Sequence, residues 1–201
     1  MPIFEFNLPK GLSRVLGLPT KSPRTSQMRV LKKLLKTAQY TSFGQKFKFA
    51  EILKHRHIGK NFQESVPTYN YNKIYKDWWH LTLEGQSDIC WPGKINYFAL
   101  SSGTSEAASK YIPITNDLLR GNKIIMIKQL LSLRSYDNIP WKSVGKGYLM
   151  LGGSTELQEG PGYFAGDLSG ITAKKAPIWF APFYKPGKKI AKTRDWNEKL
   201  E

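Results

Sequence analysis

A short, aromatic, β-prone segment runs without a break into a loop of small hydroxyl-bearing residues. The segment is INYFAL, residues 95–100, and the loop begins with SSGTSEAASK, residues 101–110. Aromatic and branched residues favour strands, whereas clustered serine and glycine residues favour an irregular connection. We therefore expect a strand at Tyr97–Leu100 that leads directly into a loop, which an all-helical bundle does not contain.

Helical patterns precede this strand. From Met28 onward, apolar residues recur three and four positions apart, with Ser26 as a candidate N-cap. A second helix is expected from about Ala50 to Gly59. The segment TSFGQKFKF between them predicts a turn at Gly44 whose aromatic rings pack against the first helix. A third helix, marked by Ile74, Trp78 and Leu81, is expected to end at Gly85.

Extended and helical segments alternate after the loop. Tyr111–Ile114 is expected to be extended, and Thr115 is a good N-cap for a helix from Asn116 to about Leu133. A further strand is expected at Gly147–Leu151. The following glycine-rich stretch contains Asp167, which we interpret as a turn aspartate.

The order of these elements predicts an α/β fold, with a helical N-terminal segment followed by alternating strands and helices. Residues 1–27 are expected to form an irregular basic arm. The segment 174–192 has no clear periodicity.

The excess of basic residues lies towards both ends of the chain and is largest at the start. The net charge is +16, and residues 1–60 hold 13 Lys/Arg against 2 Asp/Glu. Such a field attracts polyanions, although a solvated basic face explains it equally simply and no nucleic-acid recognition motif accompanies it. The helix from Met28 is itself basic and amphipathic. It is either a surface helix packed by its leucines or a helix that binds a membrane surface or a partner.

Several classes of protein are excluded. The single cysteine, Cys90, cannot form an internal disulfide, which favours a reducing, cytoplasmic environment. The start of the sequence does not have the pattern of a signal peptide, and no apolar stretch is long enough for a membrane span, so we expect neither export nor a membrane partner. The histidines His55, His57 and His80 have no metal-ligand spacing, and no metal site is assigned to them.

The loop after the predicted strand has the composition of a phosphate-binding loop. Backbone N–H groups near a glycine, several hydroxyl groups and a nearby cation suit the charge of a phosphate chain. The chain has no Walker motif and no GxGxxG pattern, so an ordinary connection remains the alternative. The candidate residues are Ser101, Ser102, Gly103, Thr104, Ser105 and Lys110.

The segment FALSSGTSEAASKYIP resembles the first nucleotide-binding motif of the Gretchen Hagen family of auxin-responsive acyl acid amido synthetases. These enzymes belong to the acyl-adenylating superfamily. The segments TSFGQKFKF, VPTYNY, WPGKINYFALSSGTS and GDLSGI and the late Asp195-Trp196 pair resemble bacterial members in the same order. The resemblance covers roughly residues 40–201, and it implies that residues 28–201 form the N-terminal portion of an adenylating domain. Ala107 stands where plant members tend to carry glycine.

This resemblance implies an ATP-dependent reaction assisted by Mg²⁺, in which a carboxylic acid is adenylated and then transferred to an amino acid. Ser101 to Ser105 would cradle the phosphates, and Lys110 would supply positive charge. Two later nucleotide motifs of the family have no counterpart in the 201 residues, so we expect this chain alone to be inactive. A basic nucleic-acid-binding module without catalysis is the disfavoured alternative.

Overall fold

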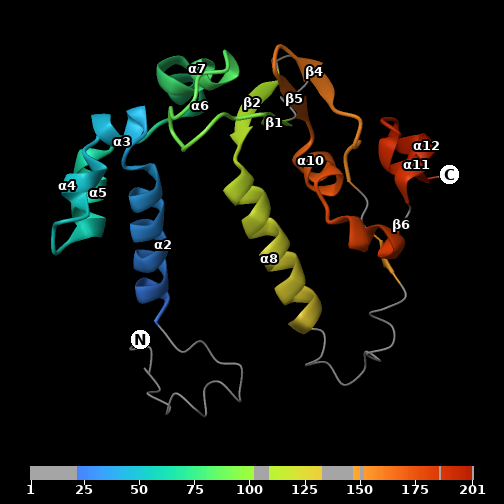
Figure 1. Cartoon of the computed structure of the whole chain (residues 1–201), viewed down its shortest axis with the longest axis horizontal. Helices are drawn as coiled ribbons and strands as arrows, with labels where there is room; N and C mark the ends of the chain where they lie inside the picture. The colour runs from blue at the N-terminus through green and yellow to red at the C-terminus, as the bar shows by residue number, and fades with distance from the viewer. Residues whose placement is uncertain (1–21, 102–108, 133–146, 150–151, 186, 201) are drawn as a thin grey trace, which may run out of the picture. The chain divides into compact units, whose positions relative to one another are not determined.

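The computed structural model describes residues 22–101, 109–132, 147–149, 152–185 and 187–200. The chain divides into two compact units (Figure 1). The first is Met1–Tyr69 with Cys90–Pro92, and the second is Asn70–Ile89 with Gly93–Glu201. Across the described ranges, no helix combines the length and the apolar character needed to cross a lipid bilayer.

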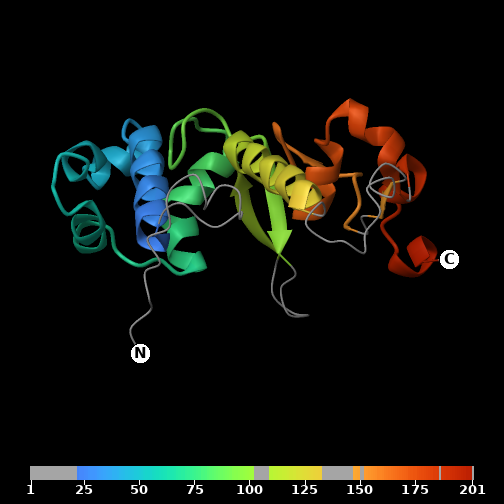
Figure 2. The same ribbon diagram turned by 90° about the horizontal axis from the view of Figure 1, so that it is seen from below.

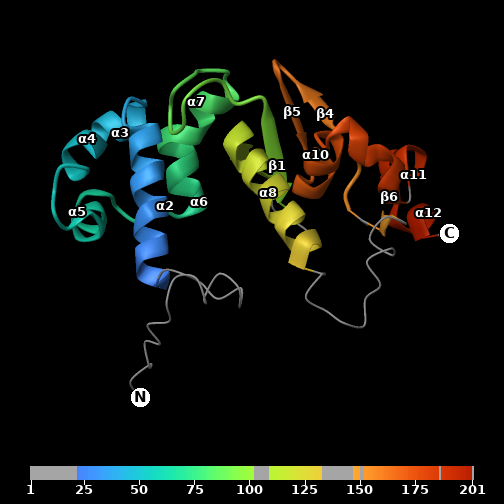
Figure 3. The same cartoon turned by 60° about the horizontal axis from the view of Figure 1, so that its bottom comes forward.

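The described part of the first unit is helical. Its helices are α2 (Pro23–Ala38), α3 (Ser42–Lys46), α4 (Phe49–Ile52) and α5 (Ile58–Ser65). Figure 3 shows α4 and α5 on the same side of α2, and the buried side chains of these elements form one core. That core consists of Leu35, Ala38, Phe49, Ile52 and Ile58.

The first helix begins five residues earlier than the sequence predicted. Ser22, and not Ser26, is the N-cap, and its hydroxyl accepts a hydrogen bond of 3.2 Å from the Thr25 N–H. Pro23 suits the first helical position because its fixed φ matches the helix and its missing N–H is not needed there. The proline taken as a mark of irregular chain therefore starts the helix. The rest of the predicted arm, residues 1–21, lies outside the described residues.

The turn predicted at Gly44 is wrong, because residues 42–46 form α3. The Thr41 hydroxyl accepts a hydrogen bond of 3.1 Å from the Gly44 N–H at the start of this helix. A side chain at Gly44 would overlap the Ala38 carbonyl oxygen, so glycine allows α3 to approach the end of α2. The predicted packing is confirmed, since Phe43 and Phe47 lie against the core that includes Leu35 and Ala38.

The single helix predicted over residues 50–59 is instead two helices, α4 and α5. Ile52 and Ile58 are both buried in the same core. In one continuous helix, residues six positions apart would face different directions. The break between the two helices allows both side chains to enter the core.

The second unit opens with the predicted third helix. It comprises α6 (Tyr71–Ile74), a π-helical turn η1 (Tyr75–Trp79) and α7 (His80–Leu83). Gly85 follows with a φ of +90°, as expected for a glycine that ends a helix. The π-helical turn is the one feature of this segment that periodicity did not predict.

A four-stranded sheet organises the second unit. Its order is β2 (Lys110–Ile114), β1 (Tyr97–Ser101), β5 (Tyr163–Gly166) and β4 (Gln158–Gly160). β1 is antiparallel to β2 and parallel to β5, and β4 is antiparallel to β5. The predicted strand after residue 95 is therefore confirmed, and it lies inside the sheet.

Both faces of this sheet are covered by apolar side chains. On one face, Ala99 packs with Leu119 of α8 (Asn116–Ser132) and Ile171 of α10 (Leu168–Lys174). Leu119, near the start of α8, provides this contact, and Figure 2 shows α8 (yellow) beside β1 and β2 (green). On the other face, Phe98 packs with Ala165, and its ring meets the edge of the Tyr163 ring. Successive residues of β1 thus serve opposite faces, which fixes the register of the strand.

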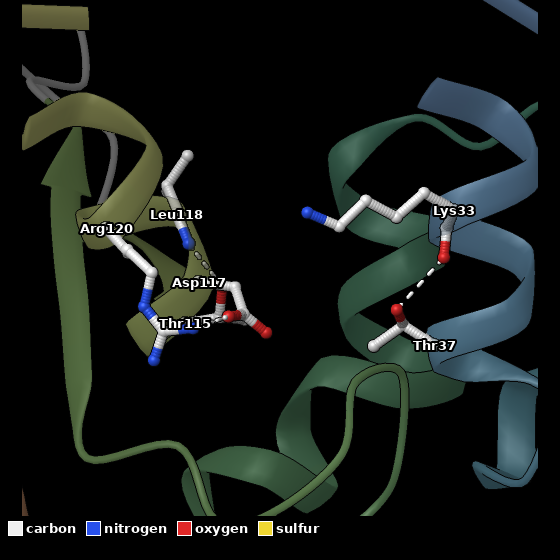
Figure 4. Close-up of polar contacts among 6 residues, drawn as sticks. All are labelled: Lys33, Thr37, Thr115, Asp117, Leu118 and Arg120. Atoms are coloured by element: carbon white, nitrogen blue, oxygen red, sulfur yellow. Dashed lines mark hydrogen bonds and ion pairs between the residues drawn. The ribbon is translucent and has the colours of Figure 1, made fainter. Parts of the chain in front are cut away.

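The helix predicted from Asn116 is confirmed together with its cap. The Thr115 hydroxyl accepts a hydrogen bond of 3.0 Å from the Leu118 N–H, and Asp117 pairs with Arg120 at 3.5 Å (Figure 4). An acidic residue in the first turn also favours the positive end of the helix dipole. The helix therefore starts where the sequence places it.

The glycine-rich stretch contains elements that the sequence analysis missed. β4, β5 and α10 all lie between residues 158 and 174. The two strands were missed because such short strands give only a weak periodic signal. Of the strand predicted at 147–151, only β3 (Tyr148–Leu149) lies within the described residues. The remaining elements are a 3₁₀ helix η3 (Ile178–Phe183), β6 (Tyr184–Lys185), α11 (Lys188–Lys192) and α12 (Trp196–Leu200).

Candidate functional site

A polar cavity of about 300 Å³ lies where β1 and β5 end. Because these strands are parallel, their carboxyl ends reach the same edge of the sheet, the usual position of ligand sites in α/β folds. The cavity is lined by Leu100, Ser101, Ser109, Gly153, Ser154, Glu156, Gln158, Ala165, Gly166, Asp167 and Arg194. This is the candidate functional site, and we call it the strand-end cavity.

The described residues include only the two ends of the predicted phosphate-binding loop. Ser101 is the last residue of β1 and lines the strand-end cavity. It is paired with Lys110, the first residue of β2, so the predicted loop joins two neighbouring antiparallel strands. Ser102, Gly103, Thr104 and Ser105 lie outside the described residues, as does Ala107. Ser109, which follows them, again lines the cavity.

Lys110 directs its charge elsewhere. Its ammonium nitrogen lies 5.2 Å from the centre of the Tyr71 ring, and it is not among the described residues that line the strand-end cavity. The Tyr71 hydroxyl accepts a hydrogen bond of 3.0 Å from the Tyr111 N–H, and burial raises the pKa of Tyr71. The backbone of Lys110 therefore lies beside Ser101, whereas its charge lies over a neutral phenol.

Closely packed glycines form one wall of the cavity. The segment 152–154 lies directly against the start of α10, and the Gly153 N–H donates a hydrogen bond of 2.8 Å to the Ser169 hydroxyl. A side chain at Gly153 would overlap the Asp167 carboxylate, and one at Gly170 would overlap the Ser154 carbonyl oxygen. This close approach requires glycine at both positions. The sequence GGS followed by GDLSG was the available signal.

Asp167 was interpreted as a turn aspartate, but its side chain faces the strand-end cavity. It occupies the N-cap position of α10, but its side chain makes no capping hydrogen bond. Its exposed carboxylate instead lines the strand-end cavity. The side chain of Asp167 is therefore available to a ligand in the cavity.

Arg194 is a cation that the sequence analysis did not identify. Its Nη2 donates a hydrogen bond of 3.4 Å to the Glu156 carbonyl oxygen, and it lines the strand-end cavity from the far end of the chain. Nearby, the Ser154 hydroxyl donates to the Lys192 carbonyl oxygen at 2.5 Å, and the Thr155 N–H donates to the Ala191 carbonyl oxygen at 2.8 Å. These bonds hold the segment that carries Arg194. No local motif predicts a contact between positions so distant in sequence.

A second, larger cavity adjoins the first. It has a volume of about 690 Å³ and shares Glu156 and Arg194 with the strand-end cavity. Its apolar lining includes Leu157, Ala173, Ala176, Pro177, Ile178 and Ala191. Lys174, Lys188 and Lys192 also line it. The arrangement suits an amphipathic anion.

Metal and thiol chemistry have little support elsewhere in the described ranges. Among those residues, no three His, Cys, Asp or Glu side chains gather as a metal site. Burial raises the pKa of the Cys90 thiol to about 12, so it stays protonated at neutral pH and is a poor nucleophile.

The chain is similar to known proteins over nearly its whole length. The family model described as the GH3 family N-terminal domain matches residues 14–201. No curated protein sequence matches the chain. A solved structure described as GH3.15 acyl acid amido synthetase matches with a TM-score of 0.68 and 21% identity. The match covers 99% of this chain and 34% of that one, so this chain spans about a third of the length of that protein.

Proposed function

Since the chain belongs to the GH3 family, we propose that its strand-end cavity binds the phosphates of ATP for the adenylation of a carboxylic acid. The observation that carries this proposal is the position of Ser101. This residue opens the loop with phosphate-binding composition, and it lies at the carboxyl end of β1 beside the parallel strand β5. A phosphate chain bound by that loop would enter a cavity already lined with polar groups.

Three described side chains have suitable chemistry for the phosphates. The hydroxyl groups of Ser101 and Ser109 donate hydrogen bonds, and the Arg194 guanidinium offers several N–H donors with a fixed positive charge. Ser102 to Ser105 are proposed to add hydroxyl and backbone donors, as the family resemblance implies. Lys110 is proposed to turn from Tyr71 towards the phosphates, since its side chain is exposed and flexible.

The carboxylates in the cavity fit Mg²⁺ carried by the nucleotide. Mg²⁺ commonly takes one or two carboxylate oxygens and completes its shell with phosphate oxygens and water. Asp167 has no capping bond to give up, and Glu156 lines the same cavity. When bound, the ion would offset the negative charge of the phosphates during the reaction.

The acid substrate is proposed to occupy the adjoining cavity. Its apolar part would contact Leu157 and Ala173, and its carboxylate would lie near Arg194 at the shared boundary. One carboxylate oxygen then attacks the α-phosphorus of ATP. The new O–P bond forms as the bond to the bridging oxygen breaks, and pyrophosphate leaves with that electron pair. An amino acid amine subsequently attacks the acyl carbon, and AMP leaves.

An equilibrium titration of MgATP into the 201-residue chain tests the phosphate site. We expect saturable binding that pyrophosphate competes away, and a two- to tenfold loss of affinity on Ser101→Ala, about the value of one hydrogen bond. Ser132→Ala, which alters an exposed serine at the end of α8, is the matched control. Absence of saturable binding, or equal affinity for all three proteins, would overturn the proposed site.

The chain alone is expected to bind without turnover. Adenylation requires donors that converge on one transition state, and two of the family's nucleotide motifs have no counterpart in these 201 residues. Acid-dependent exchange of labelled pyrophosphate into ATP measures this directly. Exchange above background by the purified chain would contradict the expectation.

A further inference from the structure

Helix α2 presents three stripes of side chains with different chemistry. The first stripe faces the core of the first unit and consists of Met28, Leu31, Leu35 and Ala38, spaced three and four apart. Leu35 and Ala38 are buried, and Met28 lies close to Gly59 of α5. This stripe accounts for the packing of the helix onto α4 and α5, as Figure 3 shows.

The second stripe is apolar but exposed. Val30 and Leu34 lie one helical turn apart and are 56% and 46% exposed. Tyr40, just beyond the end of α2, is 78% exposed. None of the three belongs to the buried core of the first unit. Packing within the unit therefore does not explain them.

The third stripe is basic and lies beside the second. Arg29, Lys33 and Lys36 are spaced four and three apart and are all exposed. Figure 4 shows the extended side chain of Lys33 next to Thr37, whose hydroxyl donates to the Lys33 carbonyl oxygen at 2.9 Å. The helix contains five basic residues and no acidic residue. We call the exposed apolar and basic stripes together the outer face of α2.

Acidic side chains of the same unit do not neutralise this face. Residues 22–69 contain ten Lys/Arg and two Asp/Glu. Both acids pair with lysines outside α2: Glu51 with Lys48 at 3.7 Å, and Glu64 with Lys60 at 3.8 Å. Within residues 22–69, therefore, neither acid pairs with a cation of the outer face.

We propose that the outer face of α2 binds an anionic lipid surface. A helix that lies in the membrane interface needs exposed aliphatic groups to enter the acyl boundary and cations beside them for the headgroups. Val30 and Leu34 supply the first, and Lys33 and Arg29 supply the second. Phosphate-driven binding of nucleic acid would engage the cations but does not require the exposed aliphatic side chains. This binding would be peripheral, so it needs no membrane span, and it would be independent of the strand-end cavity. It departs from the expectation, drawn from the absence of a span, that the chain has no membrane partner.

Vesicle flotation with the full 201-residue chain tests the proposal. The two probes are vesicles of phosphatidylcholine alone and vesicles that also contain phosphatidylserine. We expect binding to the anionic vesicles, strong weakening at high salt, and little binding to the neutral ones. Equal binding to both kinds of vesicle, or no binding at low salt, would overturn the proposal.

Two pairs of charge reversals locate the surface. Arg29→Glu with Lys33→Glu should lower the vesicle partition coefficient at least about tenfold. Lys54→Glu with Arg56→Glu makes the same change in net charge on exposed residues outside α2, and it should have a smaller effect. Equal effects of the two pairs would show that net charge, and not the outer face, is responsible.

An aliphatic variant separates lipid from nucleic acid. Val30→Ser with Leu34→Ser should reduce vesicle binding while leaving the fold intact, because both side chains are about half exposed. Circular dichroism and the thermal midpoint check the fold. A single-stranded RNA titrated in parallel is the alternative probe. If RNA binds as well as the vesicles do, and the aliphatic variant changes neither affinity, the surface is a general polyanion site and the lipid proposal is wrong.

Discussion

The two units use glycine and charge differently. In the first unit, Gly44 brings two helices together, and the basic residues lie on the exposed surface. In the second unit, Gly153 and Gly170 bring two loops together, and acids and cations meet around a cavity. Close packing in the first unit completes a core, whereas in the second it forms the wall of a candidate site. The concentration of charge in the first unit therefore does not mark the site.

The largest effects should come from the two cores. Phe98→Ala in the second unit should lower the free energy of unfolding by about 3–5 kcal/mol, and Leu35→Ala in the first by about 2–5 kcal/mol. Both side chains are almost fully buried, so each substitution leaves a cavity. Hydrogen exchange measured on peptides from each unit should show lost protection mainly in the unit that carries the change.

Conservative replacements are the control for these two truncations. Phe98→Leu and Leu35→Met retain most of the buried volume and should cost less than the alanine variants. If either alanine variant removes protection equally from both units, the two cores are one cooperative structure and the comparison fails.

The next largest effect should be a loss of MgATP affinity, and only substitutions in the second unit should cause it. Removing a charge-assisted contact costs about 1.5–3 kcal/mol, or roughly 10- to 150-fold in MgATP affinity. We expect a loss in this range for Arg194→Ala, and for Lys110→Ala if its side chain turns towards the phosphates. Lys189→Ala, an exposed lysine of α11 outside the lining of both cavities, is the control.

Arg194→Ala and Lys110→Ala also test separately whether each residue contacts the phosphates. Unchanged affinity in Lys110→Ala with the fold intact would leave that lysine with its Tyr71 contact alone. Unchanged affinity in Arg194→Ala would remove the strand-end cavity from the phosphate proposal, even if the chain binds nucleotide.

Periodicity predicted the fold where elements are long. The amphipathic α2 and the capped helix from Asn116 were predicted, because leucine spacing and a threonine cap act locally. β4 and β5 were missed because strands of three and four residues carry too few side chains for a period-two signal. β5 forms by pairing with β1, which is more than fifty residues away in sequence, and β4 in turn pairs with β5.

Of the strand-end cavity, the sequence predicted Ser101 but not the roles of Arg194 and Asp167. Ser101 was identified because hydroxyl residues adjoin a β-prone segment, which is a local pattern. Arg194 was not identified, since its position depends on hydrogen bonds that the Ser154 hydroxyl and the Thr155 N–H donate to carbonyl oxygens of α11, far along the chain. Asp167 was seen but given the structural role, because a sequence does not show whether a cap bond is made.

Glycine substitutions give the next smaller effects and compare the units directly. Gly44→Ala and Gly153→Ala each place a Cβ atom against fixed groups, the Ala38 carbonyl and the Asp167 side chain. Each should cost about 1–3 kcal/mol of unfolding free energy. Gly153→Ala should also weaken MgATP binding, whereas Gly44→Ala should not. Loss of binding in both variants, at a temperature where both are folded, would contradict the assignment of the cavity to the second unit.

The smallest expected effect is a gain in stability at Gly121. This residue lies inside α8, where glycine is less favourable than alanine by up to about 1 kcal/mol, and a Cβ atom there meets nothing within 4 Å. Gly121→Ala should therefore stabilise the second unit by about 0.5–1 kcal/mol and leave nucleotide affinity unchanged.

Gly59→Ala in α5 is the matched change in the first unit. Its Cβ atom would lie 3.2 Å from the Met28 side chain, which must shift to make room. This shift offsets part of the stability gained by replacing glycine with alanine in a helix. Chemical denaturation of both variants measures the difference. The open surface of α8, where Ile124 and Ile125 are about half exposed, is the reason to expect the larger gain at Gly121. Destabilisation by Gly121→Ala would contradict the open space that the structure shows around this position.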